Sequence, residues 1–289
     1  MATAPSHDRA GADDGHDDFG GLHRDLPRLL GRRRALQILG GVSLAGFVAG
    51  CGSDSPGSTG GDTTSSSSGA SSRPTTAAST AAASAGEEIP DETQGPFPAD
   101  GSNGPNALTE DGIVRSDLTT SFGDASGTAE GVPMTLQLTV VDASTGNALP
   151  GAAVYLWHCT ADGRYSIYEI EDQNYLRGVQ ETDDAGKLAF TTIFPGCYAG
   201  RWPHFHFEVY DGLDRATAGS EAVKTSQIAL PESDCDAAYT DSRYGQSTGN
   251  LAQLSLTSDM VFSDAWSDQL ATVVGTIREG YTASLLVRI

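Results

Sequence analysis

"MTLQLTVVDASTGNALPGAAVYLWHC", residues 134–159, contains two apolar runs separated by a segment of turn-forming residues. The first run alternates apolar and polar residues, which is typical of a β-strand with one buried face. Thr145, Gly146 and Asn147 lie between the two runs, and residues of these types favour tight turns. The stretch therefore predicts two strands with a hairpin-like join.

Short runs of the same kind recur along the chain, rich in Val, Thr, Leu, Tyr and Phe and separated by Gly, Asp or Asn. Helical periodicity is scarce, and no internal repeat is present. The runs are "GKLAFTTIFPG" (186–196), "HFHFEVYDG" (204–212), "VKTSQIAL" (223–230), "LAQLSLTSDMVFS" (251–263), "LATVVGTI" (270–277) and "YTASLLVRI" (281–289). Strands at such spacing with turn residues between them predict an all-β fold, an antiparallel β-sandwich.

Residues 1–50 have the order of features expected of an export signal. Consecutive arginines at 32–34 precede an apolar stretch, residues 35–50, that is shorter than the roughly 20 residues needed to span a bilayer. The paired arginines resemble a bacterial twin-arginine signal, and "VAGC" ending at Cys51 resembles a lipoprotein cleavage site. We expect an exported, membrane-anchored lipoprotein at the cell surface or outside the cell. Its only membrane contact would be a lipid on Cys51.

Residues 51–86 consist almost wholly of Ser, Thr, Ala, Gly and Pro, a composition that predicts a flexible, disordered linker. Residues 87–289 are then the segment that folds, about the size of one all-β domain. From Glu87 onward the chain has ten basic and thirty acidic residues, a net charge of about −20. Such a surface repels phosphate backbones, so nucleic acid is excluded as a partner, and a small-molecule enzyme is favoured.

Three cysteines remain once Cys51 is assigned to lipid: Cys159, Cys197 and Cys235. An oxidising exterior permits one disulfide and leaves one thiol. The sequence does not choose among the three pairings, although Cys197 with Cys235 is weakly favoured. The spacing of the three does not fit a thiolate zinc site.

"GCYAGRWPHFHFEVY", residues 196–210, contains two of the chain's six histidines one residue apart. On a strand, His204 and His206 project from the same face about 6.6 Å apart, while Phe205 and Phe207 point into the core. The pair is therefore spaced to bind one ion. Two ordinary strand histidines would give the same pattern.

Two tyrosines can complete this donor set. Tyr198 precedes the histidines across a Pro-Gly-Cys turn, and Tyr165 follows a glycine where a strand is expected to end. Phenolate is a hard, anionic oxygen ligand, so two phenolates with two imidazoles favour iron(III) over zinc or copper. Other tyrosines in the same neighbourhood are competing candidates, namely Tyr155, Tyr168, Tyr175 and Tyr210.

Together these motifs resemble the intradiol ring-cleaving catechol dioxygenases, over nearly all of residues 93–289. The matching segments are "TQGPF" (93–97), "VRSDL" (114–118), "WHCTADGRY" (157–165), "RGVQETDDAGKLAFTTIFPGCY" (177–198), "RWPHFHF" (201–207) and "KTSQIAL" (224–230). The resemblance implies that a non-haem iron(III) is held by Tyr165, Tyr198, His204 and His206, with Tyr198 and His206 as the axial pair. It implies a catechol-type diol and O2 as substrates, with the ring cleaved between its hydroxylated carbons to a muconate-type diacid.

The resemblance also implies catalytic roles for three residues. Tyr198 would leave the iron when the diol binds and would take a proton as it goes. Arg201 would stabilise negative charge on the substrate ring, a role suited to a permanently charged guanidinium. Gln227 would hydrogen-bond close to the reacting groups. If they have no catalytic role, Arg201 would form an ion pair on the surface and Gln227 would be a solvated strand residue.

The chain departs from many family members in two places. Only Ala199 and Gly200 separate Tyr198 from Arg201, so the pocket is expected to be more open. No helical segment precedes the sandwich, so the oligomeric state is not inherited from the catechol-specific branch.

Two other functions remain open from the sequence. In the first, His204, His206 and Glu208 alternate onto one face and hold iron(II) or zinc. In the second, the domain is a non-catalytic, transthyretin-like surface module and binds no iron. His158, beside Trp157, is expected to be a half-exposed neighbour and not a ligand.

Overall fold

The structure of the protein is a computed structural model, and it describes residues 83–289. The predicted signal sequence and the lipid-attachment site at Cys51 lie outside the described residues, as does nearly all of the predicted linker 51–86. Within the described range, no helix is both long enough and apolar enough to cross a membrane.

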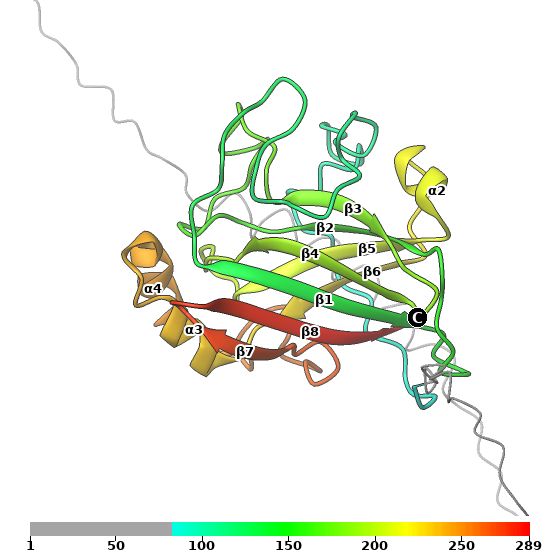
Figure 1. Cartoon of the computed structure of the whole chain (residues 1–289). Helices are drawn as coiled ribbons and strands as arrows, with labels where there is room; N and C mark the ends of the chain where they lie inside the picture. Colours follow the sequence, from blue (N-terminus) through cyan, green and yellow to red (C-terminus); the bar gives the residue numbers. More distant parts are fainter. Residues whose placement is uncertain (1–82) are drawn as a thin grey trace, which may run out of the picture.

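Two four-stranded sheets pack face to face, as Figure 1 shows. One sheet has the order β4-β1-β8-β7 and the other the order β3-β2-β5-β6. The strands are β1 (Pro133–Val141), β2 (Ala153–Trp157), β3 (Arg177–Glu181), β4 (Lys187–Ile193), β5 (His204–Tyr210), β6 (Lys224–Ala229), β7 (Thr272–Thr276) and β8 (Gly280–Arg288). Neighbours pair antiparallel except β1 with β8. The predicted all-β sandwich is therefore confirmed.

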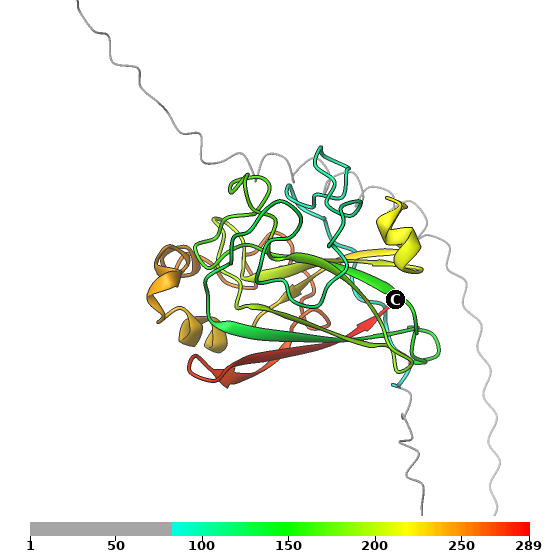
Figure 2. The same cartoon turned by 45° about the horizontal axis from the view of Figure 1, so that its top comes forward.

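The short helices lie at the ends of the sandwich, and the core is formed between the two sheets (Figure 1). They are α2 (Leu213–Thr217), α3 (Glu232–Ala238), the 3₁₀ helix η2 (Ser242–Tyr244) and α4 (Gly245–Leu251). The prediction that residues 251–263 contain a strand is wrong, because turns occupy this segment. Figure 2 shows the loops that cover the outer face of the β3-β2-β5-β6 sheet.

The turn predicted at Thr145–Asn147 forms, but it does not make a hairpin. The Gly146 amide donates to the Asp142 carbonyl at 2.8 Å, and Gly146 has φ +71, a left-handed conformation that glycine adopts without strain. However, β1 pairs with β4 and β8, whereas β2 pairs with β3 and β5. The turn therefore carries the chain from one sheet to the other. The apolar faces of β1 and β2 meet across the core and do not lie side by side in one sheet.

The β3-β2-β5-β6 sheet is buried on both faces, and this feature positions the site. All five residues of β2 and all seven of β5 are buried. From β5, Phe205 and Phe207 enter the core between the sheets, as predicted. From β2, Tyr155 and Trp157 point the other way into a second apolar cluster beneath the covering loops. Side chains on this outer face are therefore shielded from water.

The expectation of one disulfide is wrong, since Cys159, Cys197 and Cys235 are all free and buried. The Cys159 and Cys197 thiols donate instead to backbone carbonyls, of Gly196 and Arg201 respectively, each at 3.4 Å. Burial raises the pKa of the Cys159 thiol and holds that of Cys235 well above its usual range. The three thiols are therefore protonated packing residues.

Replacing Leu136 with alanine should lower the free energy of unfolding by about 3 kcal/mol, because Leu136 is fully buried on β1 and its removal leaves a cavity between the sheets. Urea unfolding measures the change. Val274→Ala is the control, since Val274 is 63% exposed on β7 and should change stability by less than about 0.5 kcal/mol. Equal losses in the two variants would contradict the assigned core.

Candidate metal centre

A row of four buried side chains crosses the outer face of the β3-β2-β5-β6 sheet. Strand register places Arg177 opposite Trp157, Trp157 opposite His206, and His206 opposite Gln227. Directly opposed residues on neighbouring strands share a face and contact one another. The row therefore gives the candidate site a floor of fixed geometry, contributed by four strands.

His204 and His206 project together from β5, as the sequence predicted. Their Nε2 atoms lie 2.9 Å apart, and the rings meet edge to face with centroids 4.6 Å apart. His204 Nδ1 donates to the Trp202 carbonyl, which leaves its Nε2 without a hydrogen. The His206 ring stacks parallel on Trp157, at 5.0 Å and 3°. Two imidazole nitrogens thus face a single point.

Burial keeps both histidines neutral. It lowers the pKa of His204 to about 3, with the positive charge of Arg201 adding to the effect. Burial also holds the pKa of His206 well below its usual range, and His204 and Arg201 lower it further. Neutral imidazole is the form that binds metals.

Tyr165 and Tyr198 come from two loops that a glycine allows to approach closely. A Cβ on Gly163, which has φ +84, would lie 3.1 Å from the Cys197 carbonyl oxygen and 3.2 Å from Tyr198 Cα. The Tyr165 ring is therefore able to meet the Tyr198 ring edge to face at 5.8 Å, and it lies 6.3 Å from the His206 ring. All four residues predicted as ligands thus gather at one place.

The Tyr165 hydroxyl is buried, and no hydrogen-bond partner for it exists within residues 83–289. Burial raises the pKa of the Tyr165 phenol well above its usual range, and the nearby Cys159 and Tyr198 contribute. A buried hydroxyl without a partner is costly in a folded protein. A bound cation would favour the phenolate and supply the missing interaction.

The N-terminal strap, residues 86–99, lies along β6 and over the histidines. Gly95 has φ +72, and a Cβ there would come within 3.0 Å of His206 Cε1. The Phe97 ring lies 4.7 Å from that of Tyr165 and 6.1 Å from that of Tyr198. Only a glycine at position 95 lets the strap cover the site this closely.

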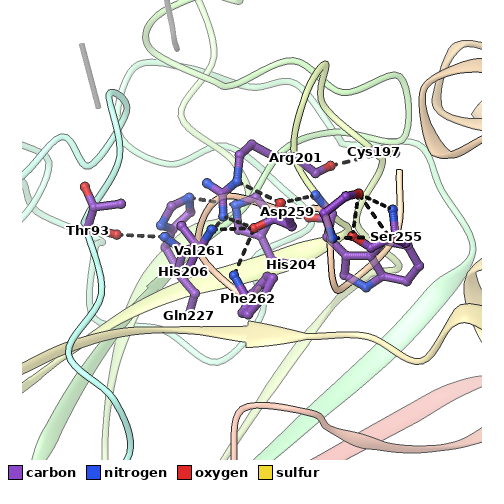
Figure 3. Close-up of polar contacts among 12 residues, drawn as sticks. Thr93, Cys197, Arg201, His204, His206, Gln227, Ser255, Asp259, Val261 and Phe262 are labelled. Carbon is purple, nitrogen blue, oxygen red and sulfur yellow. Dashed lines mark hydrogen bonds and ion pairs between the residues drawn. The ribbon is translucent and has the colours of Figure 1, made fainter. Parts of the chain in front are cut away.

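Arg201 is buried and fixed by two partners, as Figure 3 shows. Its Nε donates to Asp259 at 3.0 Å, and its Nη2 donates to Gln227 Oε1 at 2.7 Å. Gln227 Nε2 in turn donates to the Thr93 carbonyl of the strap at 2.8 Å. Gln227 therefore connects Arg201 to the strap, and neither residue is a solvated surface group.

Asp259 was not identified from the sequence. Its carboxylate accepts from Arg201 and from the backbone amides of Trp202, Val261 and Phe262, at 2.7, 2.8 and 3.1 Å (Figure 3). Burial alone would raise the pKa of Asp259, but Arg201 and these amides lower it below its usual value. The only local signal was an aspartate preceding an apolar "MVF", a weak capping pattern.

The other candidate metal ligands are bonded to other groups. Glu208 shares the histidine face, but its Oε2 accepts from the Tyr210 hydroxyl at 2.6 Å. Tyr155 and Tyr168 donate to Pro98 and Asn103. Within residues 83–289, no three histidine, cysteine, aspartate or glutamate side chains form a group suited to a metal ion.

His158 differs from its expected exposure, because it is buried and not half exposed. Its Nδ1 donates to the Cys159 carbonyl at 2.8 Å, and its Nε2 accepts from Thr192 at 2.6 Å. Both ring nitrogens are used, so His158 is a structural residue.

Comparison with known proteins agrees with this fold. A family model described as Dioxygenase matches residues 103–213. The chain is 32% identical over 76 residues to hydroxyquinol 1,2-dioxygenase of Corynebacterium glutamicum, covering 26% of this chain and 25% of that protein. It is 32% identical over 97 residues to chlorocatechol 1,2-dioxygenase of Pseudomonas putida, covering 27% and 37%. The matches thus span about a quarter to a third of these relatives.

A solved structure extends the likeness in fold. The intradiol ring-cleavage dioxygenase from Tetranychus urticae superimposes with a TM-score of 0.55 and 24% identity, over 70% of this chain and 94% of that one. The fold is therefore that of the β-sandwich dioxygenases. The chain is therefore similar to intradiol dioxygenases in two respects, in sequence over residues 103–213 and the two aligned segments, and in fold over 70% of its length.

Replacing Asp259 with alanine should destabilise the protein by about 3–5 kcal/mol, because it leaves the buried Arg201 charge unpaired and three amides without an acceptor. Asp241→Ala is the matched control, since it removes a more exposed pair with Arg243 and should cost about 1 kcal/mol. Chemical unfolding of both variants checks the difference. Similar losses would show that the Asp259 pair is not structurally special.

Glu92, on the strap, should make stability fall at high pH. Burial, with the nearby negative charge of Asp264, raises the pKa of Glu92 from 4.5 to about 7. The folded state therefore keeps this proton where the unfolded chain has lost it. The resulting stabilisation is complete below about pH 4.5 and is lost as the pH rises through 7.

We therefore expect Glu92→Gln to be more stable than the parent at pH 8, by roughly 2–3 kcal/mol, and similar to it near pH 4.5. Urea unfolding at both pH values measures this, with the exposed Glu110→Gln as control. An unchanged difference between the two pH values would rule out Glu92 as the source.

Proposed function

We propose that the protein is a non-haem iron(III) intradiol dioxygenase. It would insert both atoms of O2 into a catechol-type aromatic diol and cleave the ring between the two hydroxylated carbons, giving a muconate-type diacid. The observation that carries this proposal is the convergence of two tyrosines and two neutral histidines at one buried point. The similarity of the chain to intradiol dioxygenases supports it.

The residues present fit a ferric ion. The His204 and His206 Nε2 atoms face each other, and the buried Tyr165 hydroxyl has no partner in the described part of the chain. Phenolate oxygen with imidazole nitrogen is a donor set for a hard cation. Tyr165, Tyr198, His204 and His206 would hold the ion. When bound, the ion would act as a Lewis acid that the two diol oxygens can chelate, which would make the ring reactive toward O2.

The chain's own side chains would bind and orient the diol. Tyr198 is only partly buried and lies at the rim of the site, where its phenolate oxygen would take a proton from the diol and become the neutral phenol. Arg201 brings a permanent positive charge, fixed by Asp259 and Gln227, close to the ring. Phe97 and the strap cover the tyrosines and limit the access of water.

The loop after Tyr198 supports a site that accepts ring substituents. Ala199 and Gly200 are both exposed and carry no bulky side chain. The names of the two relatives, a hydroxyquinol and a chlorocatechol dioxygenase, belong to substituted diols. We therefore include substituted catechols in the proposed substrate class.

The proposal extends to location. The paired arginines, the apolar run and Cys51 support export and lipid anchoring, which would place the enzyme at the cell surface. An acidic domain would remain soluble there and would take small aromatic diols from the surroundings.

Full-length protein loaded with iron should bind about one ion per chain, show a visible tyrosinate-to-iron(III) band, and consume O2 with catechol, hydroxyquinol or chlorocatechol. Tyr198→Phe should shift the band and slow turnover by about 10²–10⁴-fold, the usual contribution of a proton-transfer group. His204→Ala and His206→Ala should lose the iron.

Tyr239→Phe is the matched control, because Tyr239 is a buried tyrosine whose hydroxyl donates only to the Pro195 carbonyl at 3.0 Å. It should keep both iron and colour. Full iron and an unchanged band after either histidine change would disprove the donor set. A colourless protein that binds zinc would favour the His204–His206–Glu208 alternative, and no stoichiometric metal would favour a binding module.

A further inference from the structure

Arg177, the first residue of β3, is a fully buried guanidinium that is not among the ion pairs of the described residues. All of its acceptors are neutral oxygens. Nη1 donates to the carbonyls of Phe97 and Pro98 at 2.8 and 3.2 Å and approaches the Tyr155 hydroxyl at 3.4 Å. Nη2 and Nε donate to the carbonyl and hydroxyl of Ser166 at 2.8 and 3.1 Å.

Burying an unpaired cation is costly, and an apolar side chain of similar volume would fill the space at less cost. What the guanidinium provides is a planar fork that bonds in several directions at once. Here it joins two segments far apart in sequence, the strap at 97–98 and the loop at 166.

Both segments belong to the proposed iron site. Ser166 directly follows Tyr165, and Phe97 packs its ring against Tyr165 at 4.7 Å. Trp157, the cross-strand neighbour of Arg177, stacks on His206. Arg177 therefore bonds the strap directly. It is connected to two of the four donors through one intermediate residue each, to Tyr165 through Ser166 and to His206 through Trp157.

The Tyr165 loop contains a strained residue, so it needs a contact that restrains its conformation. Ile167 has φ +74, and a β-branched residue in the left-handed region is a strained backbone conformation. The Ile167 amide is satisfied by carbonyls of its own loop, Ile170 and Gln173. The bonds from Arg177 to Ser166 are the ones that attach this strained loop to the sheet.

We propose that Arg177 is a positioning residue for the iron site, which fixes the Tyr165 loop and the strap in one geometry before the metal and the diol bind. It touches neither substrate nor metal. The inference rests on the proposed function in naming the site, but the restraint itself is a property of the metal-free protein and is tested there.

Hydrogen exchange of the metal-free full-length protein tests the restraint directly. In Arg177→Lys, a lysine with three donors on a flexible stem cannot replace the fork. The amides of Ala99 and Ile167 should exchange at least tenfold faster than in the parent, while those of β1 and β8 keep their rates.

Arg115→Lys is the matched control. Arg115 is half-buried and also donates to backbone carbonyls, of Arg177, Thr120 and Asn174, but it contacts none of the four donors. If Arg115→Lys accelerates the Ala99 and Ile167 amides as much as Arg177→Lys does, or if neither variant accelerates them, the proposal is overturned.

Iron binding gives the second readout. Arg177→Lys should weaken iron affinity by about 10–100-fold, the range typical of residues that orient ligands, and should shift or broaden the visible band. Ser166→Ala, a smaller change that removes the Nε acceptor together with the bond from the Ser166 hydroxyl to the Tyr175 carbonyl, should shift the band in the same direction with iron retained. A parental band and parental affinity in both variants would reduce Arg177 to a packing residue.

The two proposals fail separately. If the parent binds no iron, the proposed function fails, yet faster exchange confined to 95–99 and 165–170 in Arg177→Lys still establishes the restraint. If the parent binds iron with the expected colour and the exchange pattern does not change, the proposed function stands and the positioning role is wrong.

Discussion

The burial of both faces of one sheet is the constraint on which the site depends. Because β5 is covered on both sides, the alternation of Phe and His along it sends apolar rings into the sandwich core and two imidazoles into a second buried layer. A strand with one solvated face would leave the histidines in water. Their pKa values would then stay near the ordinary range, and nothing would hold the two rings facing each other.

A second buried layer creates a demand for hydrogen bonds, and the two residues at the ends of the row, Gln227 and Arg177, meet their own share of it. Gln227 uses both ends of its amide, on Arg201 and on the strap carbonyl of Thr93. Arg177 has five oxygen neighbours at its end of the same row. Against that background the Tyr165 hydroxyl, buried and without a partner among residues 83–289, is informative. Trp157 Nε1 and His206 Nδ1 are buried without a partner in the same range as well, so the unsatisfied polar groups of this layer gather around the rings of the proposed donors.

Sequence reasoning identified what alternation and local spacing encode. Strand period two placed His204 beside His206, and the turns at Pro195–Gly196 and Gly163 placed the tyrosines near them. It missed Asp259, which is 58 residues from Arg201 and meets it only through the turns after α4. It also joined β1 to β2 as a hairpin, because a turn pattern does not reveal whether the strands on either side share a sheet. These features depend on long-range packing, which leaves no periodic signal in the chain.

The two buried arginines differ in what surrounds their charge, and this difference separates their roles. Asp259 accepts from Arg201 at 3.0 Å, so that the carboxylate offsets part of the Arg201 charge and holds the guanidinium in place as a rigid donor. Arg177 has only dipolar oxygens around it, so its full positive charge remains inside the layer that contains the donors. Burial, and then the charges of His204, Arg201 and Arg177, lower the pKa of His206, so both cations act on that layer. Two phenolates and a diol dianion would bring a large negative charge into the same layer. An uncompensated guanidinium on the floor of the site would offset part of that charge, which gives a physical reason for keeping an arginine where an apolar residue would fold more cheaply.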